Sequence, residues 1–278
     1  MNVILENVSR LKEIGLVGLI TAAVGASPAM AEDAVSQHRA ALADKDANPA
    51  LLVIDQGEAL FKTKRGPKNA SLEKCDFGLG PGMIKGATAK MPRYFADTDR
   101  VQDTESRLVT CMVSLQGFDE KTIKSKTFGD QRDNEGNTDI EAIAAYVQYQ
   151  SNGMAIDPPS THPKEKEAMQ VGENLFWRRN GPLDLACGTC HAEGGKRVRL
   201  QPLLNALDKK QLQDTMASWP TYRISHGMVR TIQHRMWDCG WAMKLPDLDY
   251  GSPASVALIS YLSNQAKGAV FDLPGMKR

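Results

Sequence analysis

The five cysteines of this 278-residue sequence are the residues whose spacing most clearly indicates chemistry. Cys187, Cys190 and His191 form the motif CGTCH. This C-x-x-C-H pattern is the attachment signal for a c-type haem, because two thiols add to the porphyrin vinyl groups and the next residue offers an imidazole to iron. The motif predicts one covalently attached haem c, held by Cys187 and Cys190, with His191 as an axial iron ligand.

Two other sites also use a C-x-x-C pair, namely a redox-active dithiol and half of a zinc site. A zinc site needs two further ligands at a matching second position, and a thioredoxin-like pair needs a βαβ context. The sequence offers neither, so covalent haem attachment is the favoured interpretation.

The second axial ligand decides what such a haem could do. Four methionines lie in the right stretch for a simple electron carrier: Met216, Met228, Met236 and Met243. Cys239 lies in the same stretch, in the sequence HRMWDCGW. A thiolate is a strong, soft ligand that lowers the iron potential, which suits a site that performs chemistry. The residues alone leave both kinds of ligand open.

Elements that position these residues are visible in an internal repeat. With a shift of 115 residues, three pairs of segments match: Gly57-Glu58 with Gly172-Glu173, Leu60-Phe61 with Leu175-Phe176, and Cys75 with Cys190. A shift of 128 residues then matches Pro92 with Pro220, Arg107 with Arg235, and Cys111 with Cys239. The sequence therefore predicts two copies of one domain.

Each copy is expected to be mostly α-helical. The motif GExLF is interpreted as the opening of an amphipathic helix, and each copy closes with a helix, residues 139–150 and 253–266. Ser252-Pro253 supports the second of these, because serine is a preferred N-cap and proline suits the first helical turn. This layout is that of two tandem class I cytochrome c-like domains, the first of which has lost its haem.

The domain boundaries follow from composition. Residues 14–25 are apolar and precede Ala29-Met30-Ala31, which predicts a signal peptide over residues 1–31 and export to the periplasm, although an uncleaved N-terminal helix or membrane anchor stays an alternative. Residues 32–153 form the haem-less domain, the proline-rich segment 154–166 forms a linker, and residues 167–278 form the haem-binding domain. No membrane span is expected in the mature chain.

The first copy has lost its haem motif. Leu72 stands where the second copy has its first haem cysteine, and Asp76 stands where it has His191. Cys75 and Cys111 remain, and in a collapsed pocket they would lie within bonding distance. We therefore predict a Cys75–Cys111 disulfide, with two unconnected buried thiols as the alternative.

The overall charge excludes one class of function. The sequence has 34 basic and 33 acidic residues, a net charge of +1, and 6% aromatic residues. A chain without a strong basic excess has no general electrostatic attraction for nucleic acid, so no nucleic-acid partner is expected.

Taken together, the twofold layout, the CGTCH motif and the RxxxC motif Arg235-Met236-Trp237-Asp238-Cys239 resemble the SoxA subunit of SoxAX cytochromes, in its single-haem type. The resemblance implies an L-cysteine S-thiosulfotransferase that joins thiosulfate oxidatively to a cysteine of the carrier protein SoxYZ. It also implies a SoxX-type cytochrome partner and a cytochrome c electron acceptor. By the same resemblance, Cys239 is an axial iron ligand and the persulfide intermediate, and Arg235 binds substrate.

The residues around Cys239 fit those roles. The stretch offers several cationic or titratable side chains and few carboxylates: Arg223, His226, Arg230, His234 and Arg235. In a helix, Arg235 and Cys239 share a face, where a guanidinium could hold sulfonate oxygens and lower the thiol pKa. For Arg223 and Arg230, pairing with haem propionates or plain solvation is the competing interpretation. Two other functions stay open, a thiosulfate dehydrogenase that forms tetrathionate and a non-enzymatic electron-transfer cytochrome.

Overall fold

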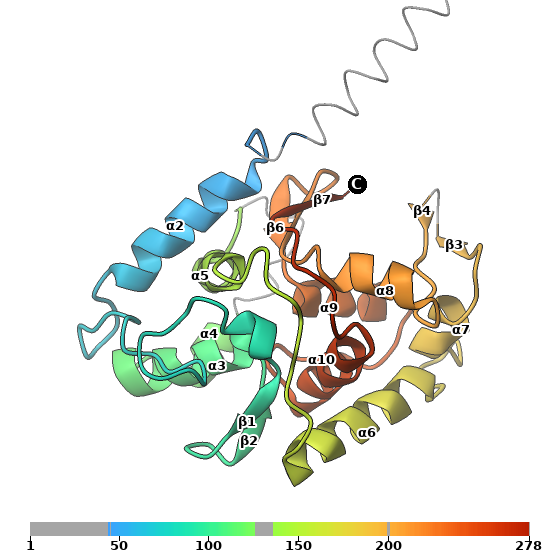
Figure 1. Ribbon diagram of the computed structural model, residues 1–278, viewed down its shortest axis with the longest axis horizontal. Coiled ribbons are helices and arrows are strands. Elements are labelled where there is room, and N and C mark those ends of the chain that lie inside the picture. Colours follow the sequence, from blue (N-terminus) through green and yellow to red (C-terminus); the bar gives the residue numbers. More distant parts are fainter. Residues whose placement is uncertain (1–43, 45, 126–135, 199–200, 278) are drawn as a thin grey trace, which may run out of the picture. The chain divides into compact units, whose positions relative to one another are not determined.

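The computed structural model describes residues 44, 46–125, 136–198 and 201–277 (Figure 1). The predicted signal peptide, residues 1–31, lies outside these ranges. Within them the chain is mostly helical, as predicted, with a few short strands. No helix in the described ranges combines the length and the apolar character needed to cross a membrane.

The helices and strands fall into two sets on either side of the segment 150–162. The N-terminal half (residues 32–153) contains α2 (Ala50–Lys62), η1 (Thr88–Lys90), β1 (Arg93–Phe95), β2 (Arg100–Gln102), α3 (Thr104–Cys111), η2 (Met112–Gln116), α4 (Glu120–Ser125) and α5 (Asp139–Tyr149). The C-terminal half (residues 167–278, with α6 entering it from Pro163) contains α6 (Pro163–Trp177), α7 (Cys187–His191), β3 (Arg197–Val198), β4 (Gln201–Pro202), α8 (Lys209–Met216), β5 (Thr221–Arg223), β6 (Met228–Arg230), α9 (Ile232–Ala242), α10 (Pro253–Gln265) and β7 (Gly275–Lys277).

A close-packed helix pair organises each half. α2 packs on α5, and α6 packs on α10, where Figure 1 shows the two helices side by side. A Cβ added at Gly57 would lie 2.0 Å from the Ala142 carbonyl oxygen, and one added at Gly172 would lie 2.0 Å from the Ala257 carbonyl oxygen. Each helix pair therefore needs a glycine at its crossing point, because any side chain there would strike the partner backbone.

A short antiparallel hairpin also occurs in each half. β1 pairs with β2, with Tyr94 opposite Val101, and β5 pairs with β6, with Tyr222 opposite Val229. A helix follows each hairpin directly, α3 after β2 and α9 after β6. Their N-caps are Asp103, which accepts from the Ser106 amide, and Thr231, which accepts from the His234 amide. Side-chain capping thus fixes where the two helices that carry Cys111 and Cys239 begin.

Buried polar contacts join the two halves. His234 Nδ1 lies 2.6 Å from Glu141 Oε1, and the side-chain Nε2 of Gln233 donates to Asp103 Oδ2 at 2.6 Å. The main apolar core belongs to the N-terminal half but includes Tyr250 of the C-terminal half, which is 1% exposed. Side chains of the N-terminal half therefore hold α9 through two of its first three residues, Gln233 and His234.

Two boundaries differ from those expected. GExLF does not open a helix: α2 begins at Ala50 and α6 at Pro163, so each motif lies in the later part of its helix. α6 also begins inside the predicted linker 154–166. The His162 side chain accepts from the Lys164 amide, Glu165 accepts from the His162 amide, and Pro163 occupies the first turn, so the helix is capped four residues earlier than the linker prediction allowed.

Candidate active site

The CGTCH motif forms a five-residue helix, α7, immediately after the loop that follows α6. An isolated bridge between Asn180 and Leu185 closes this loop, and the Thr189 hydroxyl accepts from the Ala186 amide at 2.9 Å. These contacts present Cys187, Cys190 and His191 from a single turn. All three are half-buried and line the same cavity.

The imidazole of His191 is oriented by the backbone. Its Nδ1 lies 3.0 Å from the Leu204 carbonyl oxygen, and the His191 carbonyl accepts from the Ala206 amide at 2.6 Å. Burial lowers the pKa of His191, and the Leu204 contact opposes this shift only in part. A neutral imidazole whose Nδ1–H is used by a carbonyl has Nε2 available for a metal, which is the usual arrangement of a ligating histidine.

α9 brings Arg235 and Cys239 to the same cavity. The segment is helical, so Arg235 and Cys239 have the i, i+4 spacing that places them on one face. Both side chains line the cavity with Cys187, Cys190 and His191. Every described residue that lines this cavity belongs to the range 176–277. The structure therefore brings together the five residues to which the sequence analysis assigned haem attachment, iron ligation and substrate binding.

The cavity fits a haem c. Its volume is about 450 Å³, within the range of cofactor pockets, and most of its lining is apolar, including Phe176, Leu204, Leu212, Leu258 and Leu262. Two thiols, an imidazole and a further sulfur ligand face an apolar hollow, which is the donor set that a covalently attached, axially ligated haem requires. Cys187 and Cys190 would hold the porphyrin, and His191 would ligate iron.

Burial raises the pKa of two thiols that line the cavity. It raises the pKa of Cys187 to about 11. Burial also raises the pKa of Cys239, and Arg235 opposes that rise without cancelling it. Arg235 therefore acts in the expected direction, but the net shift is upward because desolvation of the thiolate is the larger effect. Metal binding is what would keep Cys239 deprotonated at neutral pH.

The methionine alternatives separate in the structure. Met216, Met236 and Met243 line the cavity, whereas Met228 lies buried in β6 and does not. The cavity therefore offers both thioether and thiolate sulfur.

The other basic residues of this stretch have different surroundings. Arg223 lines the cavity. Arg230 and His234 instead face Glu141 of α5, at 3.3 Å and 2.6 Å, and all three are almost fully buried. For Arg230, the expectation of propionate pairing or solvation is wrong, because a carboxylate from the N-terminal half neutralises it. Local sequence could not reveal Glu141, since it lies about 90 residues away.

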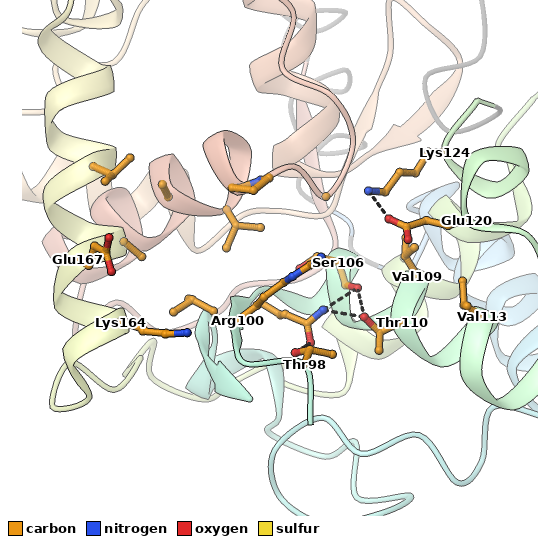
Figure 2. A pocket seen from close by; sticks show the side chains of 18 of the residues that line it. Thr98, Arg100, Ser106, Val109, Thr110, Val113, Glu120, Lys124, Lys164 and Glu167 are labelled. Carbon is orange, nitrogen blue, oxygen red and sulfur yellow. Dashed lines mark hydrogen bonds and ion pairs between the residues drawn. The ribbon is translucent and has the colours of Figure 1, made fainter. Parts of the chain in front are cut away.

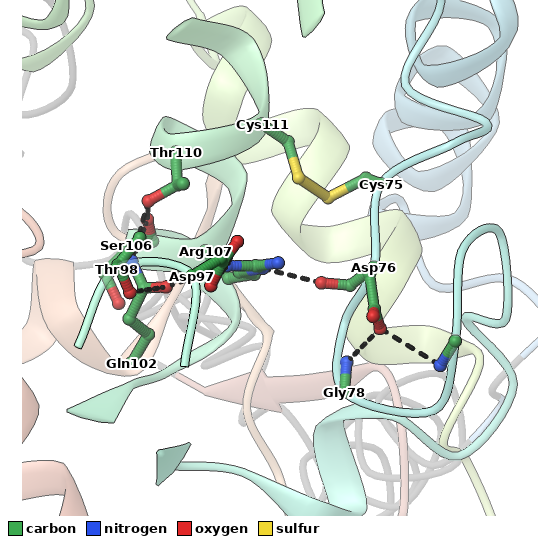
Figure 3. The surroundings of a disulfide bond; sticks show 11 residues. Cys75, Asp76, Gly78, Asp97, Thr98, Gln102, Ser106, Arg107, Thr110 and Cys111 are labelled. Carbon is green, nitrogen blue, oxygen red and sulfur yellow. Dashed lines mark hydrogen bonds and ion pairs between the residues drawn. A yellow bond between two sulfur atoms is a disulfide. The ribbon is translucent and has the colours of Figure 1, made fainter. Parts of the chain in front are cut away.

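The N-terminal half holds a disulfide at the positions that match Cys190 and Cys239 of the C-terminal half. Cys75 and Cys111 are bonded, as predicted, and both are buried (Figure 3). Asp76, which matches His191, accepts from the Gly78 and Gly80 amides through its carboxylate. Arg107, which matches Arg235, pairs with Asp97 at 2.8 Å and donates to the Asp76 carbonyl. These side chains make structural contacts rather than line a cofactor cavity.

A second hollow, of about 570 Å³, lies where β2, α3, α4, α6 and α10 meet (Figure 2). Its lining includes the ion pair between Lys124 and Glu120 and no cysteine or histidine among the described residues. It therefore lacks the ligands of a haem site.

Comparisons with known proteins show which family this chain resembles. The family model described as "SoxA/TsdA, cytochrome c domain" matches residues 56–156. A protein of Hydrogenophilus thermoluteolus named "L-cysteine S-thiosulfotransferase subunit SoxA" is 43% identical over 246 residues, which cover 88% of each chain. The chain belongs to the SoxA family. A protein of the same name from Hydrogenobacter thermophilus is 33% identical and covers 88% of this chain and 90% of its own.

A solved structure has a similar fold. The chain superposes on a chain of the crystal structure of SoxXA from P. pantotrophus with a TM-score of 0.69 and 22% identity, covering 87% of this chain and 84% of that one. Family membership makes this chain a subunit of an L-cysteine S-thiosulfotransferase with a mostly helical, cytochrome c-like fold and haem c as its implied cofactor.

Proposed function

We propose that this SoxA-family chain catalyses the oxidative conjugation of thiosulfate to a cysteine of a SoxYZ-type carrier protein. The observation that carries the proposal is the cavity itself, which Arg235 and Cys239 line together with Cys187, Cys190 and His191. A simple electron carrier needs no cysteine and no arginine beside its iron, whereas a sulfur-transfer site uses both.

The reaction balances as the removal of two electrons and one proton. A carrier thiol and thiosulfate form one sulfur–sulfur bond, which gives the carrier S-thiosulfonate, a proton and two electrons. The haem, when bound, would supply the redox centre that passes these electrons on to a cytochrome c acceptor.

Cys239 is the proposed catalytic residue, in the persulfide form that the family resemblance implies. Thiosulfate bonds through its outer sulfur to the terminal sulfur of the persulfide as two electrons leave. The carrier thiolate then attacks that outer sulfur and releases the Cys239 persulfide. Arg235, one helical turn before Cys239 on α9, is proposed to hold the sulfonate oxygens by charge-assisted hydrogen bonds.

We also propose that the chain holds one haem c, ligated by His191 and Cys239, and that its halves are two copies of one cytochrome c-like domain. The domains are residues 32–153 and 167–278, joined by the segment 154–166. Support comes from the glycine-dependent helix crossings and the matching hairpins. The Cys75–Cys111 disulfide supports a first domain without haem.

The partners and compartment are proposals from the family. A SoxX-type cytochrome subunit is the expected partner, and the match to the crystal structure of SoxXA supports this expectation. SoxYZ and thiosulfate are the expected substrates. The disulfide suits an oxidising compartment such as the periplasm. Residues 1–31, as a signal peptide, would direct the chain to that compartment.

The Cys239→Met variant tests the function. We expect the haem-loaded variant to lose thiosulfate conjugation, measured as the mass gain of the carrier protein, because methionine can ligate iron but cannot form a persulfide. Intact mass of the variant should still show one haem and one disulfide per chain. Met228→Leu is the matched control, since Met228 does not line the cavity, and it should stay active. An active Cys239→Met variant, or tetrathionate as the product, would contradict the proposal.

A further inference from the structure

Three cationic side chains converge on the wall of the haem cavity. Arg223 comes from β5, Arg235 from α9 and Lys277 from β7, and all three line the cavity. Within the described residues none of the three forms an ion pair with a carboxylate. Asp238 and Asp214 act on Arg223 and Lys277 only at longer range. No direct ion pair with a described carboxylate therefore neutralises the positive charge of this wall.

Hydrogen-bond donors on the same wall also lack acceptors. Arg223 is 8% exposed and Trp219 is 6% exposed, and both line the cavity. The Nε of Arg223 and the indole Nε1 of Trp219 are buried and have no acceptor among the residues described. Buried donors are normally satisfied, so these two point to an acceptor that the described chain does not supply.

Lys277 is held in this position by tight backbone packing. β7 runs parallel to β5 with Lys277 beside Arg223, and the Lys277 carbonyl accepts from the Ile224 amide at 2.9 Å. A Cβ at Gly275 would lie 2.2 Å from the Ser218 carbonyl oxygen, so only glycine lets the strand approach this closely. The Lys277 ammonium lies 5.4 Å from the centre of the Trp219 ring. The last described residue of the chain is thus part of the cavity wall.

Gathering these charges is unfavourable for the protein alone. Burial, Arg223 and Arg235 together lower the pKa of Lys277 to about 8. Burial and Arg235 likewise lower the pKa of Arg223. Like charges in a partly buried site repel one another unless an anion lies between them.

We propose that Lys277, with Arg223 and the indole N–H of Trp219, forms an oxyanion site on the wall of the haem cavity. This inference rests on the proposed function. Its ligand is an oxyanion from one of two sources, the sulfonate end of thiosulfate or a propionate carboxylate of the haem. Lys277 has no other assigned role, and it distinguishes this site from the Arg235–Cys239 pair.

The test compares Lys277→Gln with the wild-type holoprotein in its complex with the partner subunit. If the ligand is the sulfonate, the KM for thiosulfate rises about tenfold, while kcat and the haem midpoint potential stay unchanged. If the ligand is the propionate, the midpoint potential falls, because a cation that favours the reduced haem is lost, and the KM stays unchanged. Lys277→Arg should restore the wild-type value in either case, since it keeps the charge.

Lys62→Gln is the control, because it removes the same charge from an exposed site on α2. If Lys277→Gln has the same KM for thiosulfate and the same haem midpoint potential as this control, the proposed oxyanion site is overturned. A wild-type complex that conjugates no thiosulfate would instead overturn the proposed function, and the midpoint potential would still decide whether Lys277 contacts a haem propionate.

Discussion

At the scale of single residues, matching positions of the two halves do different work. Arg235 lines a cavity and pairs with no carboxylate in the described part of the chain, whereas the matching Arg107 is buried and paired with Asp97. Cys239 lines the cavity and forms no disulfide, whereas the matching Cys111 is bonded to Cys75. The same residue types therefore line a candidate ligand site in one half and make structural contacts in the other.

The disulfide should stabilise the N-terminal half. Its cysteines are separated by 36 residues, and closing a loop of that length lowers the entropy of the unfolded chain. Replacing both cysteines by serine should lower the free energy of unfolding by about 3–4 kcal/mol on a chain-entropy estimate. Denaturant unfolding measures this loss. Reductant should destabilise the wild type and leave the double variant unchanged; equal stability of the two proteins without reductant would contradict the structural role.

At the scale of elements, α9 is the helix on which the site depends, and the N-terminal half holds it. Glu141 of α5 contacts His234 and Arg230, and Asp103 at the start of α3 accepts from Gln233. The same helix presents Arg235 and Cys239 to the cavity. The half without the CGTCH motif thereby helps to orient the candidate catalytic residues.

Glu141→Ala should destabilise the protein by about 3–5 kcal/mol, because it leaves a buried arginine without its counter-charge. Glu141 is 1% exposed and Arg230 is 2% exposed. Burial alone would raise the pKa of Glu141, but His234 and Arg230 hold it below its ordinary value of 4.5. The stability that Glu141 contributes is therefore present above pH 4.5 and is lost as the pH falls through the lowered pKa.

Denaturant unfolding at neutral and acidic pH checks this prediction. The difference between wild type and Glu141→Ala should shrink on acidification. Glu193→Ala is the control, since it breaks an exposed ion pair with Lys196 and should cost less than 1 kcal/mol. A Glu141→Ala variant that is no less stable than this control would show that the buried contacts contribute nothing.

Sequence predicted the elements with strong local signals and missed those without them. Thr138 and Ser252 are ordinary N-caps, so the starts of α5 and α10 were correctly placed. α6 begins after His162, an uncommon cap, and its start was missed. β7 has three residues and is fixed by pairing with β5 about 50 residues earlier, so no local pattern could reveal Lys277.

At the scale of the whole described molecule, the two halves have different roles: the C-terminal half lines the cavity, and the N-terminal half contacts α9. Among the described residues, those that line the cavity all belong to the range 176–277. The buried polar contacts from the N-terminal half reach α9 from outside that lining. The motif CGTCH could be interpreted from sequence because haem attachment is encoded in five consecutive residues. The second iron ligand could not be decided between Cys239 and the methionines from the residues alone, and Met236 and Met243 line the same cavity as Cys239.

Low-temperature electron paramagnetic resonance of the purified, oxidised holoprotein tests the ligation of iron by Cys239 most directly. We expect a low-spin signal with the narrow anisotropy of thiolate ligation. The signal should change to that of histidine–methionine ligation, or to high spin, in Cys239→Met. A wild-type spectrum typical of histidine–methionine iron would contradict the account and would assign the cavity to an electron carrier.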